Sequence, residues 1–461
     1  MMLLDKAPQA DSRIRNAGAG KRLFRFAGAV FGILLLGGCS ILSGLSLLPT
    51  SPNPSPSNTE PPQSSPTQAV TAPSTTSTLQ SEQNNLIVWV PPQFDPKSDS
   101  ESGRLLQERL DEFINVHPGL TIEVRVKAES GQGGLLDSLS TTSAAAPSAI
   151  PSLVALGRLD METAVLKGLI LPWDGLIGTD FTQQLYPYAS DLGSIQKMTY
   201  GLVFAGDALV MIYRPLQVGY APESWNEYTS RGYPVIFPAG DPQALVATQM
   251  LLSLDTGEAA SDGKTVVNQE DLKKSYLAIN QGVTNQVFPY WLADYDTFDK
   301  GYQAFLDIKA NYAVVWASSV INHLPENTEL APLPGVNAGS FTLANGWMWV
   351  LPNASEEKRQ LIVALAEYLT DPQFLAQWTE AADVLPASKN ILTQWQNQTG
   401  ISVLDEIATS ARIIPSNEYL SSISPILQEG VLGMVRGQIN YLQALDNSIK
   451  DLQLIAPPSG G

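Results

Sequence analysis

We expect an α/β fold behind a long unstructured N-terminal segment, and three features of this 461-residue sequence predict it. Short apolar runs alternate with stretches of helical periodicity, which is typical of strands and helices in turn. Hydrophobic residues make up 44% of the chain, enough for sizeable cores in two or three domains. Pro, Ser and Thr crowd into a segment before residue 85, where no such alternation occurs. The alternation predicts largely parallel sheets covered by helices.

The globular part begins with strands and helices in alternation. Residues 86–90 form a continuous apolar run, as expected of a strand covered on both faces. Residues 103–120 carry apolar side chains at helical spacing and end in His-Pro-Gly, which stops the helix. Residues 121–128 alternate apolar and polar positions as a second strand. A third strand is predicted at 151–156, followed by a helix through Leu169.

Helix signals recur in the second half of the chain. Residues 297–309 predict a helix that leads into a strand at 311–317. Ser355 can cap a further helix, whose first turn holds two glutamates. Asp371 and Pro372 suit the N-cap and first position of the helix after it.

Residues 1–38 predict a lipoprotein signal peptide. A basic stretch precedes the apolar run 26–36, which at about 11 residues is too short to span a bilayer. The run ends in Leu36-Gly37-Gly38-Cys39, which resembles the lipobox of bacterial lipoproteins, whose cysteine thiol carries the lipid. Cys39 is the only cysteine, so no intrachain disulfide can form. The alternative is a free cysteine that ends an ordinary signal peptide or a short membrane anchor.

Residues 39–85 predict a disordered tether. The segment is dominated by Pro, Ser, Thr and Gln and contains no Lys or Arg, so it cannot bury enough apolar surface to fold. As a flexible chain it would span roughly 40 Å. We therefore expect it to hold a globular domain off a membrane, and a glycosylated stalk would give the same geometry.

Charge and motifs exclude several functions. A formal charge of −18 disfavours nucleic-acid binding, which depends on Lys and Arg. Two histidines, His117 and His323, leave little material for a metal site or a hydrolase triad, and no G-x-S-x-G or H-E-x-x-H occurs. Residues 257–265 have the wrong glycine spacing for a P-loop and predict a hairpin turn at Asp262-Gly263. We expect no metal, no cofactor and no catalysis.

One stretch places a carboxylate inside an apolar strand. In residues 199–215, Gly206 and Asp207 are flanked on both sides by continuous apolar sequence. Because burying an unpaired charge is costly, Asp207 requires either a partner or a wet cleft.

Several pieces resemble, in order, the extracellular solute-binding proteins of ABC importers, of the sugar-binding type related to maltodextrin-binding protein. The resemblance runs from about residue 86 to 386, and its strength lies in the order and spacing of the pieces. Two departures are Ser152, where the family usually has Asp, and Arg214, which replaces an Asn. The matching pieces are residues 110–126, 147–176, 200–215, 222–228, 345–378 and 384–388.

The resemblance implies a two-lobed, periplasmic-binding-protein-like fold of type II, with discontinuous lobes, hinge strands and a ligand between them. The expected lobes are 86–204 with about 298–344, and about 205–297 with 345–461. It further implies an extracytoplasmic, lipid-anchored monomer that captures a small solute, best suited to a carbohydrate, for an ABC permease. A ligand sensor without a transporter and a secreted carbohydrate-active enzyme remain alternatives.

The same resemblance implies a set of ligand contacts. Asp207 takes the place of an acidic sugar-binding residue on the segment that crosses between lobes, with Gly206 as a hinge. Trp347 matches a cleft tryptophan, although it or Trp349 could instead be core. Arg158 follows the third strand, where a solvated surface Arg is the alternative. The remaining candidates are Ser318, Ser319, Trp291 and Trp89, and for Trp291 packing against a lobe is equally expected.

Overall fold

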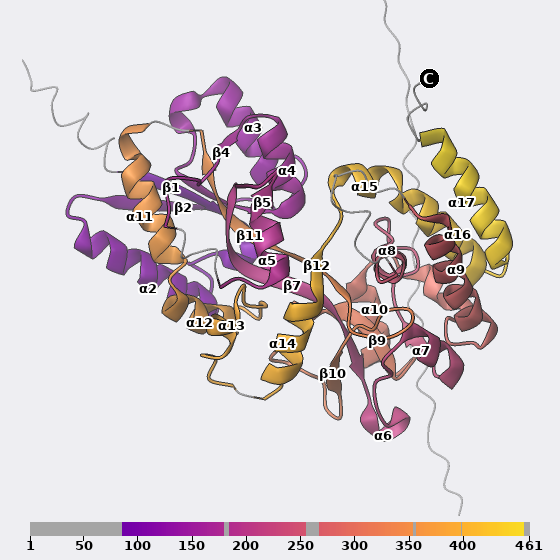
Figure 1. Cartoon of the computed structure of the whole chain (residues 1–461). Helices are drawn as coiled ribbons and strands as arrows, with labels where there is room; N and C mark the ends of the chain where they lie inside the picture. The colour runs from indigo at the N-terminus through magenta and orange to yellow at the C-terminus, as the bar shows by residue number, and fades with distance from the viewer. Residues whose placement is uncertain (1–84, 179–183, 255–266, 354–355, 398, 456–461) are drawn as a thin grey trace, which may run out of the picture. The chain divides into compact units, whose positions relative to one another are not determined.

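The computed structural model describes residues 85–178, 184–254, 267–353, 356–397 and 399–455 (Figure 1). The predicted signal peptide, Cys39 and nearly all of the tether lie outside them, as do Ser355 and the turn at Asp262-Gly263. The strands are β1 (Asn85–Val90), β2 (Thr121–Val126), β3 (Leu153–Gly157), β4 (Ile170–Leu171), β5 (Ser194–Ile195), β6 (Met198–Thr199), β7 (Gly201–Tyr213), β8 (Val235–Ile236), β9 (Tyr312–Trp316), β10 (Glu329–Pro332), β11 (Thr342–Pro352) and β12 (Ala411–Ile413).

Helices separate most of these strands, as the alternation predicted. In the first part of the chain they are α2 (Glu101–Val116), α3 (Leu135–Ala145), α4 (Arg158–Leu166), α5 (Pro187–Gly193), α6 (Pro215–Val218), α7 (Trp225–Arg231), α8 (Leu245–Leu252) and α9 (Gln269–Thr284). The later ones are α10 (Phe298–Leu306), α11 (Arg359–Leu369), α12 (Pro372–Ala381), α13 (Lys389–Leu392), α14 (Ile401–Ser410), α15 (Asn417–Ser422), α16 (Ser424–Val435) and α17 (Tyr441–Ile455). Short 3₁₀ turns are η1 (Pro92–Phe94), η2 (Pro147–Ala149), η4 (Tyr290–Asp294), η5 (Ala317–Ser319) and η6 (Glu356–Lys358).

Local sequence accounts for the helix ends. In α2 the Ser100 hydroxyl accepts a hydrogen bond from the Gly103 amide at 3.0 Å, and the helix ends before His117-Pro118-Gly119. In α12 the Asp371 carboxylate accepts bonds from the amides of Gln373 and Phe374, and Pro372 stands at the first helical position, as predicted. The predicted helix after β3 ends earlier, at Leu166.

The sheet mixes parallel and antiparallel strand pairs. β1 pairs parallel with β2 and β3, and β11 then pairs antiparallel with both β3 and β7. The expectation of largely parallel sheets therefore holds for β1 to β3 and for two short pairs, β8 with β9 and β11 with β12, whereas the central strands pair antiparallel. The reason is that β11 lies between β3 and β7 and runs in the opposite direction to both, so the parallel order ends at β3.

β7 belongs to two sheets. Its residues 201–208 pair with β11, whereas residues 209–213 pair with β9 on one side and residues 210–213 pair with β10 on the other. We call the sheet of β1, β2, β3, β11 and the first part of β7 the first lobe. The second lobe contains β8, β9, β10 and the rest of β7 (Figure 1).

Strand pairing groups two segments differently from the expected lobes. β9, with α10 packed on it, pairs with β7 and β8 of the second lobe, although residues 298–344 were expected in the first. β11 pairs with β3 of the first lobe, and α11 and α12 pack near α2, although residues from 345 onward were expected in the second. The physical reason is that β7 runs from one sheet into the other without a turn signal, and β11 later brings the chain back to the first sheet.

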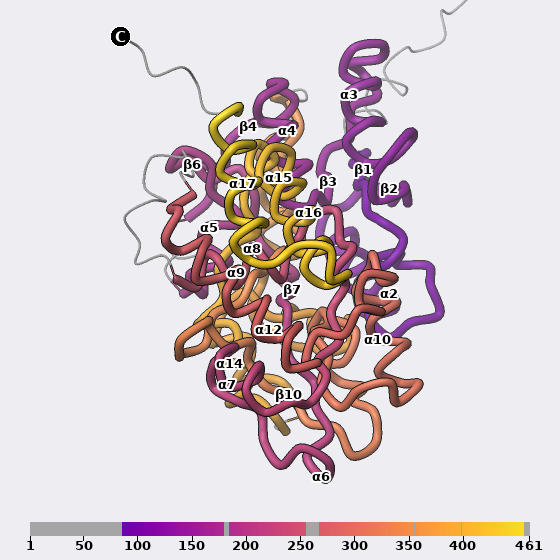
Figure 2. Tube along the Cα trace, turned by 90° about the vertical axis from the view of Figure 1, so that its right-hand side faces the viewer, coloured from indigo at the N-terminus to yellow at the C-terminus, as the bar shows by residue number. Residues whose placement is uncertain are grey.

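Three apolar cores hold these layers together. One lies within the first lobe and includes Leu106, Phe113 and Trp349. A second fills the second lobe, where α8, α9, α16 and α17 lie together (Figure 2). The third continues from one lobe to the other and includes Val154, Val210 and Val315. The lobes are therefore joined by packed side chains as well as by strands.

Candidate functional site

Asp207 is held in place by Ser318. Its Oδ2 accepts a hydrogen bond from the Ser318 hydroxyl at 2.5 Å, and its Oδ1 accepts from the Ser318 amide at 3.0 Å and from the Ala208 amide at 2.9 Å. Ser318 lies in η5, directly after β9. The carboxylate in the apolar strand thus has its partner in a turn 111 residues later in the chain.

The half-buried position of Asp207 shifts its titration. Loss of hydration raises the pKa of Asp207 to about 6, although hydrogen bonds from Ser318, Ala208 and Ala317 act to lower it. A carboxylate can accept about four hydrogen bonds, and Ser318 (twice), Ala208 and Ala317 together account for that number, so what remains open to a ligand is the solvent-exposed side of the group. Ser319, the next residue after Ser318, is also half-buried.

Asn345 lies directly across from Asp207. The two residues are register partners in the β7–β11 ladder, so their side chains share one face of the sheet. The Asn345 Oδ1 atom is buried and has no hydrogen-bond partner among the described residues. Asn345 thus adds an unused acceptor beside the carboxylate.

Gly206 is a glycine because of close packing rather than backbone freedom. Its φ is not positive, and its amide and carbonyl exchange hydrogen bonds of 2.8 and 2.7 Å with Leu385. A Cβ atom at this position would lie 2.2 Å from the Tyr188 hydroxyl oxygen and 2.8 Å from the Leu385 carbonyl oxygen. The predicted hinge residue therefore lies opposite Gly346 of β11 on one side and is hydrogen-bonded to Leu385 on the other.

Trp347 is half-buried, whereas Trp349, on the same face of β11, is 2% exposed. Trp349 stacks on Phe204 with ring centroids 4.5 Å apart, as a core residue would. The register partners of Trp347 on the neighbouring strands are Gly157 and Ala205, which are too small to cover the indole from the sides. Of the two tryptophans, Trp347 is therefore the one whose side chain is accessible to a ligand.

Arg158 serves the fold. The residue is 8% exposed, and its Nη1 donates to the carbonyl oxygens of Asp191, Leu192 and Ser194 at 2.7, 2.8 and 2.6 Å. Its Nε donates to Glu162 at 2.9 Å. The three carbonyls lie at the C-terminal end of α5, where helix carbonyls lack partners and a cation is favoured. Arg158 thus joins α4 to α5.

Trp89 and Trp291 differ in their surroundings. Trp89 is 2% exposed in the core that joins the lobes, with the Lys127 ammonium 4.4 Å from its ring centroid. Trp291 is half-buried in η4 and packs edge-on against Tyr295 with centroids 5.9 Å apart. Trp291 therefore packs against its lobe, which was the alternative to a ligand contact, and its side chain is still partly exposed to solvent.

Polar residues missed in the sequence follow the three parallel strands. Gln93 follows β1, Glu129 follows β2, and Asp160 lies in the first turn of α4 after β3. Partial loss of hydration raises the pKa of Asp160. The pKa of Glu129 is raised by partial loss of hydration and by the nearby Asp160 carboxylate, whereas a hydrogen bond from Gln93 acts to lower it. The carboxyl ends of parallel strands are where open α/β sheets bind ligands, and this rule could have found all three.

Trp316 was also missed. It is the last residue of β9, is half-buried, and lies two positions before Ser318. Its ring meets Phe298 edge-on, with centroids 5.6 Å apart. An aromatic residue at a strand end beside a predicted contact would have been the signal.

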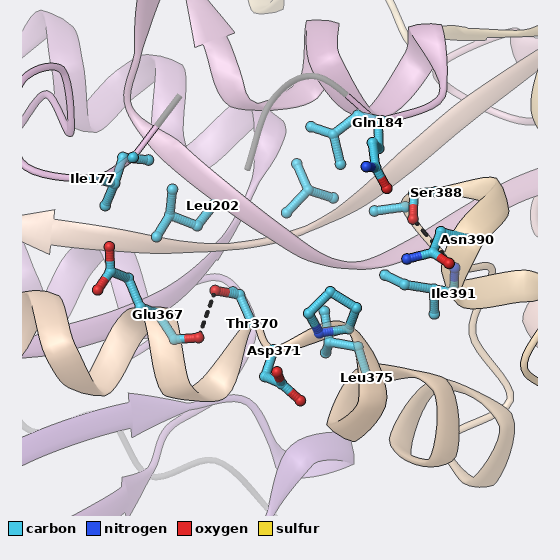
Figure 3. A pocket seen from close by; sticks show the side chains of 15 residues that line it. Ile177, Gln184, Leu202, Glu367, Thr370, Asp371, Leu375, Ser388, Asn390 and Ile391 are labelled. Carbon is cyan, nitrogen blue, oxygen red and sulfur yellow. Dashed lines mark hydrogen bonds between the residues drawn. The ribbon is translucent and has the colours of Figure 1, made fainter. Parts of the chain in front are cut away.

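A pocket of about 470 Å³ lies elsewhere in the first lobe (Figure 3). It is lined by residues such as Leu202, Gln184 and Asn390, and none of the predicted ligand contacts is among them. Three of its polar side chains serve helix ends: Asp371 caps α12, Ser388 caps α13, and the Thr370 hydroxyl donates to the Ala366 carbonyl at 2.8 Å. We therefore keep the candidate site at Asp207.

Two further properties bear on function. Within the described ranges no three His, Cys, Asp or Glu side chains are grouped so that they could hold a metal ion. No helix in that part of the chain combines the length and apolar character needed to cross a bilayer.

A family model described as "Bacterial extracellular solute-binding protein" matches residues 108–401, which is more than half of the chain. The chain belongs to this family. A solute-binding protein of an extracellular family acts outside the cytoplasm, and the members of the family are binding proteins. None of the curated proteins compared with this solute-binding protein matches it.

Solved structures similar to this solute-binding protein share its two-lobed fold. A cyclo/maltodextrin-binding protein in complex with maltotetraose is 18% identical, over 82% of this chain and 98% of that chain, with a TM-score of 0.64. The extracellular solute-binding protein from Staphylococcus aureus in complex with maltose is 16% identical, over 80% and 97%, with a TM-score of 0.64. Maltose-bound MalE3 of T. maritima is 17% identical, over 81% and 100%, with a TM-score of 0.60. The expected two-lobed α/β fold is thereby confirmed.

Proposed function

We propose that this solute-binding protein captures a carbohydrate between its lobes and delivers it to the permease of an ABC importer. One observation carries the proposal: a part-exposed carboxylate, Asp207, is held where β7 passes between lobes, near the part-exposed Trp347. Sugar hydroxyls donate to carboxylates, and sugar ring faces stack on aromatic rings. The maltose and maltotetraose in the similar structures support the same class of ligand.

The proposed contacts come from both lobes. Asp160, Glu129 and Gln93 belong to the first lobe, and Ser318, Ser319, Trp316 and Trp291 to the second. Arg158 and Trp89 are left out, because Nε and Nη1 of Arg158 are bonded internally and Trp89 is core. The two carboxylates at the strand ends favour a neutral ligand over an anion.

In the proposed mechanism the open lobes sample closure, and the ligand stabilises the closed state by touching both. The closed state docks on the permease. This chain performs no chemistry, since ATP hydrolysis belongs to a separate subunit. We further propose that Cys39 carries a lipid anchor, that residues 40–84 form the tether, and that the protein acts as a monomer.

A thermal-shift screen tests the proposal, using the protein without its signal peptide against mono-, di- and oligosaccharides, polyols and polyamines. A ligand at a hundred times its dissociation constant should add about 2.7 kcal/mol of stability, which raises the melting temperature visibly. With the sugar found, Asp207→Asn should weaken binding by about 1.5–3 kcal/mol. The control is Glu326→Gln, at an exposed position on the surface loop after η5, which should bind as the unaltered protein does.

Other outcomes separate the rivals. A response to polyamines or another solute, with none to any sugar, would retain solute binding and discard the carbohydrate. Turnover of chromogenic glycosides would instead indicate a secreted enzyme. Capture of a membrane kinase rather than permease subunits in a pull-down would indicate a sensor.

A further inference from the structure

Asp383 occupies a position that local physics disfavours. It comes directly after Ala382, the C-cap residue of α12, and has a φ of +56°. Glycine, or less often asparagine, is the usual residue in this left-handed conformation after a helix. A carboxylate also opposes the partial negative charge at a helix C-terminus. Glycine would be more stable here both in backbone conformation and in charge, so we expect the aspartate side chain to make a compensating interaction.

The Asp383 carboxylate contacts a segment that follows η5. The Asn322 Nδ2 atom donates to Asp383 Oδ1 at 3.0 Å and to the Glu380 carbonyl oxygen at 2.7 Å, which uses both of its hydrogens. The His323 Nε2 atom lies 3.4 Å from Asp383 Oδ2, but His323 is largely exposed. Asn322 is half-buried, so the bonds from its amide are the stronger part of this contact.

The two sides of the contact belong to different lobes. α12 is fixed to the first lobe, where the Trp378 indole donates to the Ser102 carbonyl at 3.1 Å. Asn322 follows β9 and η5 and leads to β10, both strands of the second lobe. The contact also lies close to the crossing point in sequence: Ser318, which holds Asp207, is four residues before Asn322, and Leu385, which bonds Gly206, is two residues after Asp383.

We propose that Asp383 and Asn322 form a clamp between the lobes, which restrains their relative motion beside the crossing strands. The unfavourable residue at the end of α12 is retained because its carboxylate makes this bond. The clamp requires only the two-lobed fold, so it stands or falls independently of whether the ligand is a sugar.

Hydrogen exchange of the full chain, followed by mass spectrometry without any ligand, tests the clamp. Asp383→Gly suits the end of α12 but removes the carboxylate. We expect exchange about threefold to tenfold faster in peptides that cover residues 206–208, 317–322 and 384–386, with α12 itself unchanged or slower. Asp383→Asn tolerates the left-handed conformation and keeps an acceptor for Asn322, so it should exchange close to the unaltered protein. Glu326→Gln, on the same surface loop as Asn322, should do the same.

A second variant shows whether the two residues act through each other. Asn322→Ala removes the bond to Asp383 and the bond to the Glu380 carbonyl, so its effect should be at least as large as that of Asp383→Gly, and the double variant should be no faster than Asn322→Ala alone. Unchanged exchange at the crossing peptides in Asp383→Gly would overturn the clamp. So would additive effects in the double variant, or faster exchange within α12, because each would assign Asp383 a purely local role.

Discussion

Replacing Gly206 by alanine should destabilise the protein although it adds only one methyl group. The added Cβ would lie 2.2 Å from the Tyr188 hydroxyl oxygen and 2.8 Å from the Leu385 carbonyl oxygen, both well inside contact distance. Tyr188 is fully buried, and its hydroxyl donates to the Pro386 carbonyl at 2.9 Å, so the ring cannot move without breaking that bond.

The magnitude follows from these two terms. Overpacking a closely packed site costs about 1–3 kcal/mol. Losing the buried Tyr188–Pro386 hydrogen bond costs about 1–3 kcal/mol more, because polar groups are left without partners. Gly206→Ala should therefore lower the free energy of unfolding by roughly 2–6 kcal/mol, measured by urea denaturation followed by circular dichroism.

Two comparisons make the result specific. Gly157→Ala is the matched control, since a Cβ there would have its nearest neighbour 3.9 Å away, and the variant should unfold within about 1 kcal/mol of the unaltered protein. In a Tyr188→Phe background the closest clashing atom is gone, so Gly206→Ala should cost at least about 1 kcal/mol less than it does alone. Equal stabilities for Gly206→Ala and Gly157→Ala, or no relief from Tyr188→Phe, would refute the packing argument.

Two further predictions concern charged residues of the crossing region and the first lobe. The pKa of Asp207 is raised to about 6 in the fold, above the value of about 3.9 for an unfolded Asp, so the fold favours the protonated carboxyl. The resulting contribution to stability is complete below about pH 4 and is lost as the pH rises through about 6. Asp207→Asn should remove this decline of about 2–3 kcal/mol from the stability profile between pH 4 and 7, and an unchanged slope would contradict the assigned shift. Arg158→Met should lower the free energy of unfolding by about 3–5 kcal/mol, because Glu162 and three carbonyls lose their donor. Its ligand affinity should stay within about twofold by calorimetry, whereas lost affinity at unchanged stability would return Arg158 to the binding site.

Patterns that depend on neighbouring residues could be predicted from the sequence. The strands β1, β2 and β3 follow from apolar runs and alternation, and the N-cap of α12 follows from Asp371-Pro372. Asp207 could be recognised as an anomaly, because a charge inside an apolar strand requires an explanation from within the strand itself. Its partner could not be recognised as such, because Ser318 lies 111 residues away and bonds through its backbone amide as well as its hydroxyl.

Distant contacts account for what the sequence could not reveal. Arg158 stands at a strand end, as a ligand contact would, but its guanidinium turns back to carbonyls 33 to 36 residues later. In the sequence, Gly206 suggests a flexible hinge. Only the position of Tyr188 in the fold shows that glycine is required because no room exists for a Cβ atom. The assignment of segments to lobes depends on the order of the strands in the sheet, which is set by contacts between segments far apart in sequence.

The shared strand β7 has a mechanical consequence. Its first part is hydrogen-bonded antiparallel to β11 and its second part antiparallel to β9. Inter-strand hydrogen bonds of this kind run perpendicular to the strands, so a force that pulls the lobes apart along β7 loads a whole ladder at once, in shear. The connection should therefore resist extension far better than bending. A pull along β7 would therefore leave the two lobes joined, whereas bending at this strand is opposed by the side chains packed between the lobes.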